Sequence, residues 1–580
     1  MNHQDFILTE RAEEGQVFEL AFYAYSNSSG KTNFFHLDIA AYEEEAAKFY
    51  YDFKVPFEAA DLLEEDDLER IETFKILGEA LNLVDFRRPG SGEFLASLTK
   101  ADEWLLEHYY KDRPENPVTV HSIGHTHIDV AWKWPLKQTR QKVVRSFQTV
   151  LNLMKRYPEY KFMSSQPQLY EFVKEEAPGV FAQIKERIKE GRWETEGAMW
   201  LEPDCNLASG ESLIRHILYG KRFFEKEMGG TENEVLWLPD VFGYSAAIPQ
   251  IMKQSGLPYF MTTKLGWNEW NQFPSDVFRW KGIDGSEVLT YLISTRDYLK
   301  KQETQKNFST TYNGRQDARQ IMGTWQRFQN KDVSKEVLTC YGYGDGGGGP
   351  TEEMLEQSRR LEFSVVRAPK TKQTFVKDFF HMLEEQMDRK QLPVWEGELY
   401  LETHRGTYTS MAKNKKYNRT CEFLNGDAEF YGVLDYVLTG SREYPFQELE
   451  KNWKLLLLNQ FHDILPGSSI KEVYEDSNVQ YEQIIKSGTS LIDHSRGRIL
   501  HAAGLKRAEE SAQGLVVWNQ MSFSRTGIVE LNHPIPGIPL LSQQTADETT
   551  LYLAEEVPSK GYGIYAVSYT HLRAHETAAN

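Results

Sequence analysis

The chain has 580 residues, of which 66 are basic and 85 are acidic, so its formal net charge is −19. This negative balance argues against a nucleic-acid partner, because phosphates require a basic surface. No stretch approaches the ~18–20 consecutive apolar residues that cross a bilayer, so no membrane insertion is expected. A chain of this length is expected to form more than one domain.

The first sixteen residues, MNHQDFILTERAEEGQ, lack the apolar centre of a signal peptide. The three cysteines, Cys205, Cys340 and Cys421, lie far apart and form no disulfide framework. These two features predict a cytoplasmic protein. The sequence leaves the oligomeric state open.

Residues 1–52 contain the pieces VFELAFYAYS and FFHLDIAAY, in which apolar and polar residues roughly alternate. This alternation predicts a partial N-terminal β region. Residues 53–115 change to a helical period, with apolar residues at spacings of three to five, and are predicted to be a helical linker segment.

Residues 116–390 contain seven short apolar runs, and segments with a helical period follow them. The runs are VTVHSIG, KFMSS, WETEGAM, VLWLP, YFMTT, VLTYLI and VLTCYGYG. Strands that alternate with helices predict a parallel sheet with right-handed crossovers. We therefore predict an α/β fold with a seven-stranded (β/α) barrel-like catalytic domain, to which FSVV at residues 363–366 could add a strand.

Residues 391–505 are largely helical in pattern, as in WKLLLLNQF, and predict a three-helix bundle as the middle domain. Residues 506–567 return to strand-like runs and are expected to begin a C-terminal β-sandwich domain. The final residues 568–580, SYTHLRAHETAAN, form an atypical tail that is unlike the rest of the chain.

Polar residues gather where the predicted strands end, which is the edge at which sites form in parallel α/β folds. The first strand continues into HSIGHTHIDVAWKW, with His127 and Asp129 two positions apart. In extended backbone these two side chains point to the same side. Three histidines and an aspartate within nine positions favour metal binding by part of this cluster over a purely structural role.

Two further aspartates follow predicted strands. Asp240 comes directly after the apolar run of VLWLP, where it is either a metal ligand or nucleophile, or a turn residue before a helix near Ser245. Asp345 lies between glycines in YGYGDGGGGP, either as a general acid/base on a mobile rim or as a turn in a flexible loop.

The segment LLLLNQFHDILPGSS places His462 and Asp463 after an apolar helical run. A histidine from the bundle could complete a mixed nitrogen and oxygen coordination shell. The residue types alone do not favour His462 over His404 or His216.

Together these segments resemble glycoside hydrolase family 38, the retaining α-mannosidases. HTHIDVAW resembles the family's His-x-Asp metal motif, WLPDVFGYS its nucleophile motif, and QFHDILPGSS its His-Asp motif. GAMWLEPDCNLASGES and ELYLETHRGTYTSMAKNKKYNR also match, and the resemblance runs roughly from Phe35 to Val567. GDGGGGP is similar to the branch that contains bacterial and cytosolic enzymes.

The resemblance implies a divalent ion, usually zinc, although cobalt or manganese also suits such a site. Its implied ligands are His127, Asp129, Asp240 and His462. Asp240 would also be the nucleophile and Asp345 the acid/base. The implied substrate-binding residues are Trp132, Phe242 and Asp463.

Retaining hydrolysis requires one nucleophilic and one proton-donating carboxyl group. The resemblance implies that the ion grips two sugar hydroxyls and need not activate water. The implied substrate is a terminal α-linked mannose of an oligosaccharide or glycan. Family members continue into further β domains that are nearly absent here, so we also expect this chain to be a fragment.

Two other functions remain open. A zinc deacetylase or amidohydrolase also places His and Asp at barrel strand ends, but its metal activates water. A non-catalytic carbohydrate-binding protein would bind mannosides without turnover.

Overall fold

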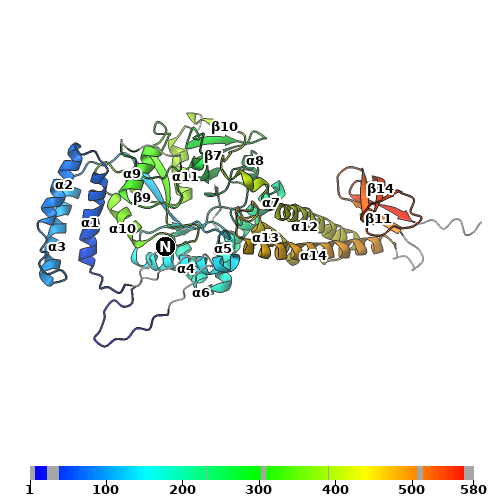
Figure 1. Cartoon of the computed structure of the whole chain (residues 1–580), viewed down its shortest axis with the longest axis horizontal. Helices are drawn as coiled ribbons and strands as arrows, with labels where there is room; N and C mark the ends of the chain where they lie inside the picture. The colour runs from blue at the N-terminus through cyan, green and yellow to red at the C-terminus, as the bar shows by residue number, and fades with distance from the viewer. Residues whose placement is uncertain are drawn as a thin grey trace, which may run out of the picture. The chain divides into compact units, whose positions relative to one another are not determined.

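The structure is a computed structural model. It describes residues 7–21, 38–229, 232–301, 303, 309–388, 391–505 and 514–566. The chain divides into two compact units, residues 1–418 with 457–478, and residues 419–456 with 479–580 (Figure 1).

The first unit begins with a helical group. It contains α1 (Glu44–Asp61), α2 (Leu68–Leu81), α3 (Gly92–Leu105) and the π-helix η1 (Leu106–Tyr110). Helix α1 starts within the predicted β region, and the described residues 7–21 and 38–43 form no strand. Residues 22–37 lie outside the described part. Phe49 of α1 packs with Leu98 and Ala101 of α3, so the apolar residues of α1 follow a helical period.

All seven predicted strands form in the first unit, and three more accompany them. The strands are β1 (Thr119–His125), β2 (Phe162–Met163), β3 (Trp193–Glu194), β4 (Val235–Trp237), β5 (Tyr259–Thr262), β6 (Val277–Lys281), β7 (Glu287–Leu292), β8 (Glu336–Tyr341), β9 (Lys370–Gln373) and β10 (Val394–Glu396). FSVV forms no strand, and β9 follows it instead.

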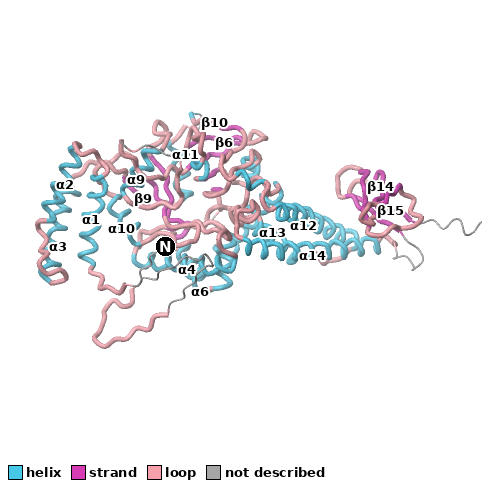
Figure 2. The backbone as a smooth tube through the Cα atoms, in the orientation of Figure 1, coloured by secondary structure: helices cyan, strands magenta, loops and turns pink. Residues whose placement is uncertain are grey.

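These strands form two sheets of five (Figure 2). One has the order β3-β2-β1-β8, with β9 also beside β1, and the other has the order β10-β6-β7-β5-β4. All pairs are parallel except β6 and β7, which are antiparallel. In the longest pairing, β1 runs beside β8 from Thr119↔Glu336 to Gly124↔Tyr341. A single closed ring of seven strands stays a prediction.

Side chains bridge the breaks between the two sheets. The carboxylate of Glu196, beyond β3, accepts hydrogen bonds from the backbone N–H groups of Glu234 and Val235 at 3.2 Å each. At the other break, Leu338 N donates to the hydroxyl of Tyr291 at 2.8 Å. Residues from both sheets share one apolar core, which includes Val120, Val235, Met261, Tyr291 and Leu338. The fold is therefore α/β with predominantly parallel strands around a common interior.

Helices follow the strands along the chain. They are α4 (Leu136–Arg156), α5 (Pro167–Glu176), α6 (Pro178–Lys189), α7 (Gly210–Met228), α8 (Ile248–Gln254), α9 (Ala318–Arg327), α10 (Glu352–Leu361) and α11 (Val376–Gln386), with the 3₁₀-helices η2 (Lys264–Trp267) and η4 (Arg405–Tyr408). Helix α4 buries Val143, Phe147, Val150 and Met154 on one face, as the predicted helical period requires.

The boundary between the units runs through α12 (Ala412–Thr439), α13 (Phe446–Asn459) and α14 (Lys471–Ala502). In the second unit these helices share an apolar cluster that includes Tyr431, Leu449 and Ile492. The second unit also contains a two-stranded and a three-stranded antiparallel sheet. Their strands are β11 (Gly514–Asn519), β12 (Arg525–Leu531), β13 (Leu541–Gln544), β14 (Thr550–Val557) and β15 (Gly561–Ala566).

The atypical tail lies outside the described residues. Among the described helices, none combines the length and the apolarity needed to cross a membrane. All three cysteines are free and buried.

Candidate metal centre and active site

The backbone beyond β1 presents His127 and Asp129 on the same side. Nε2 of His127 lies 3.0 Å from Oδ1 of Asp129, and both residues are buried. The backbone N–H of Asp129 donates a hydrogen bond to the carbonyl oxygen of Asp345 at 2.9 Å. The spacing of two residues in extended backbone therefore produces the arrangement that the sequence predicts.

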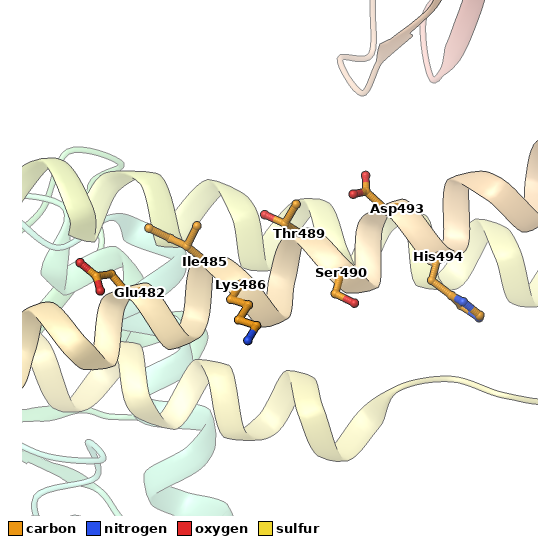
Figure 3. Close-up of a pocket in the computed structure, with 7 residues that line it drawn as sticks. All are labelled: Glu482, Ile485, Lys486, Thr489, Ser490, Asp493 and His494. Carbon is orange, nitrogen blue, oxygen red and sulfur yellow. The ribbon is translucent and has the colours of Figure 1, made fainter. Parts of the chain in front are cut away.

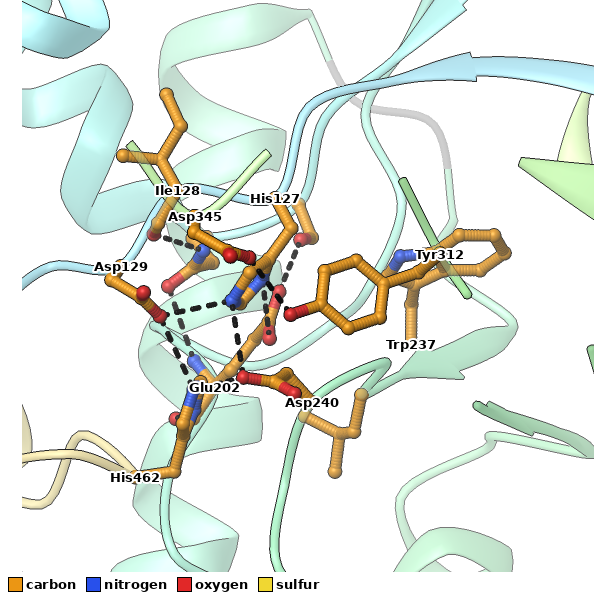
Figure 4. Close-up of polar contacts among 12 residues, drawn as sticks. His127, Ile128, Asp129, Glu202, Trp237, Asp240, Tyr312, Asp345 and His462 are labelled. Atoms are coloured by element: carbon orange, nitrogen blue, oxygen red, sulfur yellow. Dashed lines mark hydrogen bonds and ion pairs between the residues drawn. The ribbon is translucent and has the colours of Figure 1, made fainter. Parts of the chain in front are cut away.

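Asp240 and His462 complete a cluster with these two residues (Figure 4). Oδ2 of Asp240 lies 3.9 Å from Nε2 of His127 and 3.7 Å from Nε2 of His462. Nε2 of His462 lies 3.5 Å from Oδ1 of Asp129. One potential ligand atom from each of the four residues lies within 4.8 Å of all the others.

The donor set suits a divalent ion. It offers two imidazole nitrogens and two carboxylates, a combination that zinc, cobalt or manganese accepts. Nε2 of His462 is fully buried and forms no hydrogen bond among the described residues, so it is directed at the cluster without a hydrogen-bond partner there. A bound cation would satisfy this nitrogen and offset the two buried carboxylates.

The charges of the cluster perturb one another. Burial opposes protonation of His462, but Asp129 and Asp240 raise its pKa to about 10. Burial likewise opposes protonation of His127, while the Glu202 and Asp129 carboxylates raise its pKa well above the usual value. Burial opposes ionisation of Asp240, yet Lys264 and the two imidazoles hold the pKa of this carboxyl well below its usual range. The buried carboxylates therefore favour a positive charge within the cluster, whether on the imidazole rings or on a bound cation.

Asp345 is held close to the cluster by polar neighbours. Its Oδ1 accepts hydrogen bonds from the hydroxyl of Tyr312 at 2.8 Å and from Nδ2 of Asn313 at 3.3 Å. The Tyr312 ring lies edge-on to the His127 ring, with 5.1 Å between centroids. Both hydrogen bonds use the same oxygen, and neither of them involves Oδ2 of Asp345.

The glycine-rich loop around Asp345 is anchored. Tyr343 and Gly349 exchange two backbone hydrogen bonds of 2.9 and 2.8 Å, and Gly348 N donates to Oγ of Ser146 at 2.9 Å. Gly347, Gly348 and Gly349 all have positive φ, between 71° and 129°, which explains the glycines. The glycines therefore close a tight turn, and the mobility of this rim stays a prediction.

Two parts of the chain match known protein-family domains. Residues 117–398 match the glycosyl hydrolases family 38 N-terminal domain, and residues 402–499 match the alpha mannosidase middle domain. The first match includes His127, Asp129 and Asp240, and the second includes His462. The chain belongs to glycoside hydrolase family 38.

Members of family 38 are similar to this chain over most of its length. Alpha-mannosidase 2C1 of Homo sapiens is 35% identical over 497 residues, which are 86% of this chain and 45% of the relative. Alpha-mannosidase of Saccharomyces cerevisiae is 36% identical over 490 residues, covering 80% of this chain and 43% of the relative. The chain therefore spans somewhat less than half the length of these relatives. The crystal structure of an alpha-mannosidase from Enterococcus faecalis shares the fold, with a TM-score of 0.62 at 18% identity over 77% of this chain and 56% of that one.

Two of the three residues expected to bind sugar in family 38, Phe242 and Asp463, lie next to the cluster. The Phe242 ring lies edge-on to the His462 ring, with 5.6 Å between centroids. Asp463 is buried and accepts a hydrogen bond from Ser468, and burial together with Asp129 raises its pKa to about 7. The carbonyl of Trp132 accepts a hydrogen bond from Ile470 N at 2.9 Å, which holds it beside the loop after His462.

The alternative histidines lie outside the cluster. His404 stacks on Phe242 at 4.5 Å, and His216 is buried with Nε2 3.2 Å from Oε1 of Gln460. Burial lowers the pKa of His216 and of His125 to about 3, which suits neutral structural histidines. His121 contacts Thr374 and Glu336. Of the three histidines in HSIGHTHIDVAWKW, only His127 therefore joins the cluster.

Three residues that contact the candidate ligands or Asp345 in this chain were not identified from the sequence. Lys264 forms a buried ion pair with Asp240, Tyr312 donates to Asp345, and Glu202 contacts both clustered histidines. The weak signal for Lys264 was a lysine directly after the apolar strand YFMTT. Glu202 lies in the segment GAMWLEPDCNLASGES, which resembles family 38 but carries no histidine that would mark a metal site.

One further surface feature lies in the second unit. An open hollow runs along α14, and all its lining residues belong to that helix (Figure 3): Glu482, Ile485, Lys486, Thr489, Ser490, Asp493 and His494. It contains no residue expected to act in family 38.

Proposed function

We propose that this chain is a retaining α-mannosidase that removes terminal α-linked mannose from oligosaccharides or glycans. One observation carries the proposal. In a family 38 chain, potential ligand atoms of His127, Asp129, Asp240 and His462 lie within 4.8 Å of one another, and the backbone N–H of Asp129 donates to the carbonyl oxygen of Asp345. The relatives named alpha-mannosidase support the substrate class.

The proposed ligands are His127, Asp129, Asp240 and His462, with zinc as the first candidate ion. When bound, the ion supplies a Lewis acid that orients sugar hydroxyls. Asp240, held as a carboxylate by Lys264, attacks the anomeric carbon of mannose. Asp345 donates its proton to the leaving oxygen as the glycosidic bond breaks.

The second half of the reaction reverses these roles. Asp345, now a carboxylate, takes a proton from water, and the resulting hydroxide displaces Asp240 from the anomeric carbon. The product keeps the α configuration because two inversions occur. Trp132 and Phe242 pack against the sugar, and Asp463 accepts hydrogen bonds from its hydroxyls.

Hydrolysis of an aryl α-mannoside tests the activity. We expect turnover that a chelator abolishes and zinc, cobalt or manganese restores, with the matching β-mannoside inert. Absence of turnover with every one of these ions would contradict the proposal. A rate that a chelator leaves unchanged would contradict the metal requirement alone.

A fluorinated mannoside inactivator tests the mechanism. We expect a covalent adduct on Asp240, found by mass spectrometry of the digested protein, and none in Asp240→Asn. The first product released should be the α anomer by NMR. A zinc deacetylase would give no adduct, and family membership does not favour that alternative. A carbohydrate-binding protein would give neither adduct nor turnover. The cytoplasmic location stays a prediction.

A further inference from the structure

Glu202 contacts both candidate histidine ligands without being a ligand itself. Its Oε2 lies 3.1 Å from Nδ1 of His127. Its backbone carbonyl oxygen accepts hydrogen bonds from Nδ1 of His462 at 2.9 Å and from the backbone N–H of His462 at 3.2 Å. We propose that Glu202 is the positioning residue of the metal centre. This inference rests on the metal-dependent function proposed above.

The contacts define which nitrogen of each ring faces the cluster. A neutral imidazole carries its proton on one nitrogen, and an acceptor at Nδ1 fixes the proton there. Glu202 places a carboxylate oxygen 3.1 Å from Nδ1 of His127, as an ion-pair partner, and its carbonyl oxygen accepts a hydrogen bond from Nδ1 of His462. With a metal ion bound in place of the Nε2 contact to Asp129, the Nε2 lone pairs of both rings would face the ion, and a carboxylate or carbonyl behind a histidine ligand usually fixes this orientation.

Among the described residues, the side chain of Glu202 has few partners other than His127. Glu202 is 1% exposed, and its Oε2 forms no hydrogen bond among the described residues, so His127 is its ion-pair partner. Its Oε1 accepts a hydrogen bond from Ser165 Oγ at 3.2 Å. A buried carboxylate is costly unless it is paired, so the presence of Glu202 beside a candidate ligand points to a role at the site.

An uncommon backbone conformation at Gln166 supports the same arrangement of Glu202 and the ligand segment. Gln166 has φ of 65°, an uncommon value for a residue other than glycine. In this conformation its Nε2 donates to the carbonyl of Ile128 at 3.2 Å, and its Oε1 accepts from Glu202 N at 3.5 Å. Ile128 lies between His127 and Asp129. Gln166 therefore ties the backbone of Glu202 to the segment that carries two ligands.

Metal titration tests the proposal without using activity. Metal-free wild type, Glu202→Gln and Glu202→Ala are titrated with Zn²⁺ against a chromophoric chelator, and with Co²⁺ while its visible absorption is recorded. We expect Glu202→Ala to bind both ions about 10–100-fold more weakly and to alter the cobalt spectrum. Glu202→Gln should lie between, because its amide oxygen can still accept from His127 while Ser165 accepts from its amide nitrogen.

Glu196→Gln is the matched control, because Glu196 is also 1% exposed but bridges two strands away from the cluster. It should bind metal as wild type does. A Glu202→Ala protein that binds zinc within about 3-fold of wild type, with an unchanged cobalt spectrum, overturns the proposal. If Glu202→Ala is unfolded by circular dichroism, an unchanged affinity and spectrum in Glu202→Gln overturns it instead. Wild type that binds no metal would contradict the proposed function itself.

Discussion

Lys264 and Asp240 form an ion pair in which both side chains are buried. Lys264 approaches Oδ1 of Asp240, whereas Oδ2 of the same carboxylate faces Nε2 of His127 and of His462. The ammonium group also lies 4.1 Å from the centroid of the Trp267 ring and 5.2 Å from that of Phe242. The two oxygens of the proposed nucleophile therefore have separate partners.

Replacement of Lys264 should impair chemistry more than metal binding. Lys264→Met removes the partner of Oδ1 but leaves Oδ2 and the three other ligands, so we expect kcat on an aryl α-mannoside to fall about 100-fold or more. Zinc stoichiometry should stay at one per chain. Lys264→Arg should recover part of kcat, because it keeps the charge. A Lys264→Met protein with wild-type kcat would show that the pair is not needed.

Metal binding should also stabilise the folded chain. An ion that binds the native state alone at a concentration of ~1,000 times its Kd adds about 4 kcal/mol to the free energy of unfolding. We expect zinc to raise the melting temperature of chelator-treated wild type and to have no such effect on His462→Ala. His404→Ala should retain the full zinc effect, since His404 lies outside the cluster. Differential scanning calorimetry measures these shifts, and a zinc response in His462→Ala equal to wild type would exclude His462 as a ligand.

The role of Asp345 can be tested through its neighbour Tyr312. Tyr312→Phe removes the 2.8 Å hydrogen bond to Oδ1 of Asp345 but leaves that from Asn313. We expect about a 10-fold loss of kcat/KM on substrates with poor leaving groups and little loss on a dinitrophenyl mannoside, which needs no proton donor. Asp345→Asn should show the same leaving-group dependence with a loss of about 100-fold or more.

The matched control is Tyr341→Phe, which removes a buried hydroxyl whose hydrogen bond goes to Gln373 at 2.8 Å. This variant should keep wild-type kcat/KM on both kinds of substrate. Equal losses on good and poor leaving groups in Asp345→Asn would argue against a proton-donating role.

The stability of the fold should depend on pH, because Glu196, which links the segment beyond β3 to β4, can gain or lose a proton. Burial and the neighbouring Glu194 raise the pKa of Glu196 to about 8, from an ordinary value of 4.5. The folded state therefore holds this proton more tightly than the unfolded state. The resulting stabilisation is complete below the unfolded pKa and is lost as the pH rises through about 8.

Glu196→Gln cannot ionise, and its amide oxygen can still accept from Val235 N. We expect this variant to melt with wild type near pH 5 and roughly 2–4 °C higher than wild type near pH 8.5. Glu385→Gln, an exposed glutamate on α11, should match wild type at both values. A difference of the same size at acidic pH would exclude ionisation of Glu196 as the cause.

Short-range pattern was enough to predict part of this molecule. The seven apolar runs became strands, and the spacing of His127 and Asp129 predicted two members of the cluster, because both signals depend on residues close in the chain. Strand β9, KTKQ, carries no apolar pattern, and β6 pairs antiparallel with β7, so neither was predicted. The two sheets meet through the side chains of Glu196 and Tyr291, which strand patterns cannot reveal.

The rest of the site depends on contacts between distant segments. His462 was indistinguishable from His404 until the family resemblance selected it, because a lone histidine carries no local sign of what it faces. Glu202 lies 75 positions from His127 and 260 from His462, and nothing in its own neighbourhood indicates either contact. Positioning residues of this kind become visible only when the fold brings the segments together.

The hydrogen bond from Asp129 N to the carbonyl of Asp345 joins the backbone of a proposed metal ligand to the backbone of the proposed proton donor. The loop of residues 343–349 is closed by its own backbone pair, so its length determines where that carbonyl lies. An inserted residue there would displace Asp129 as well as Asp345. The number of residues in this loop is therefore constrained as tightly as their identity.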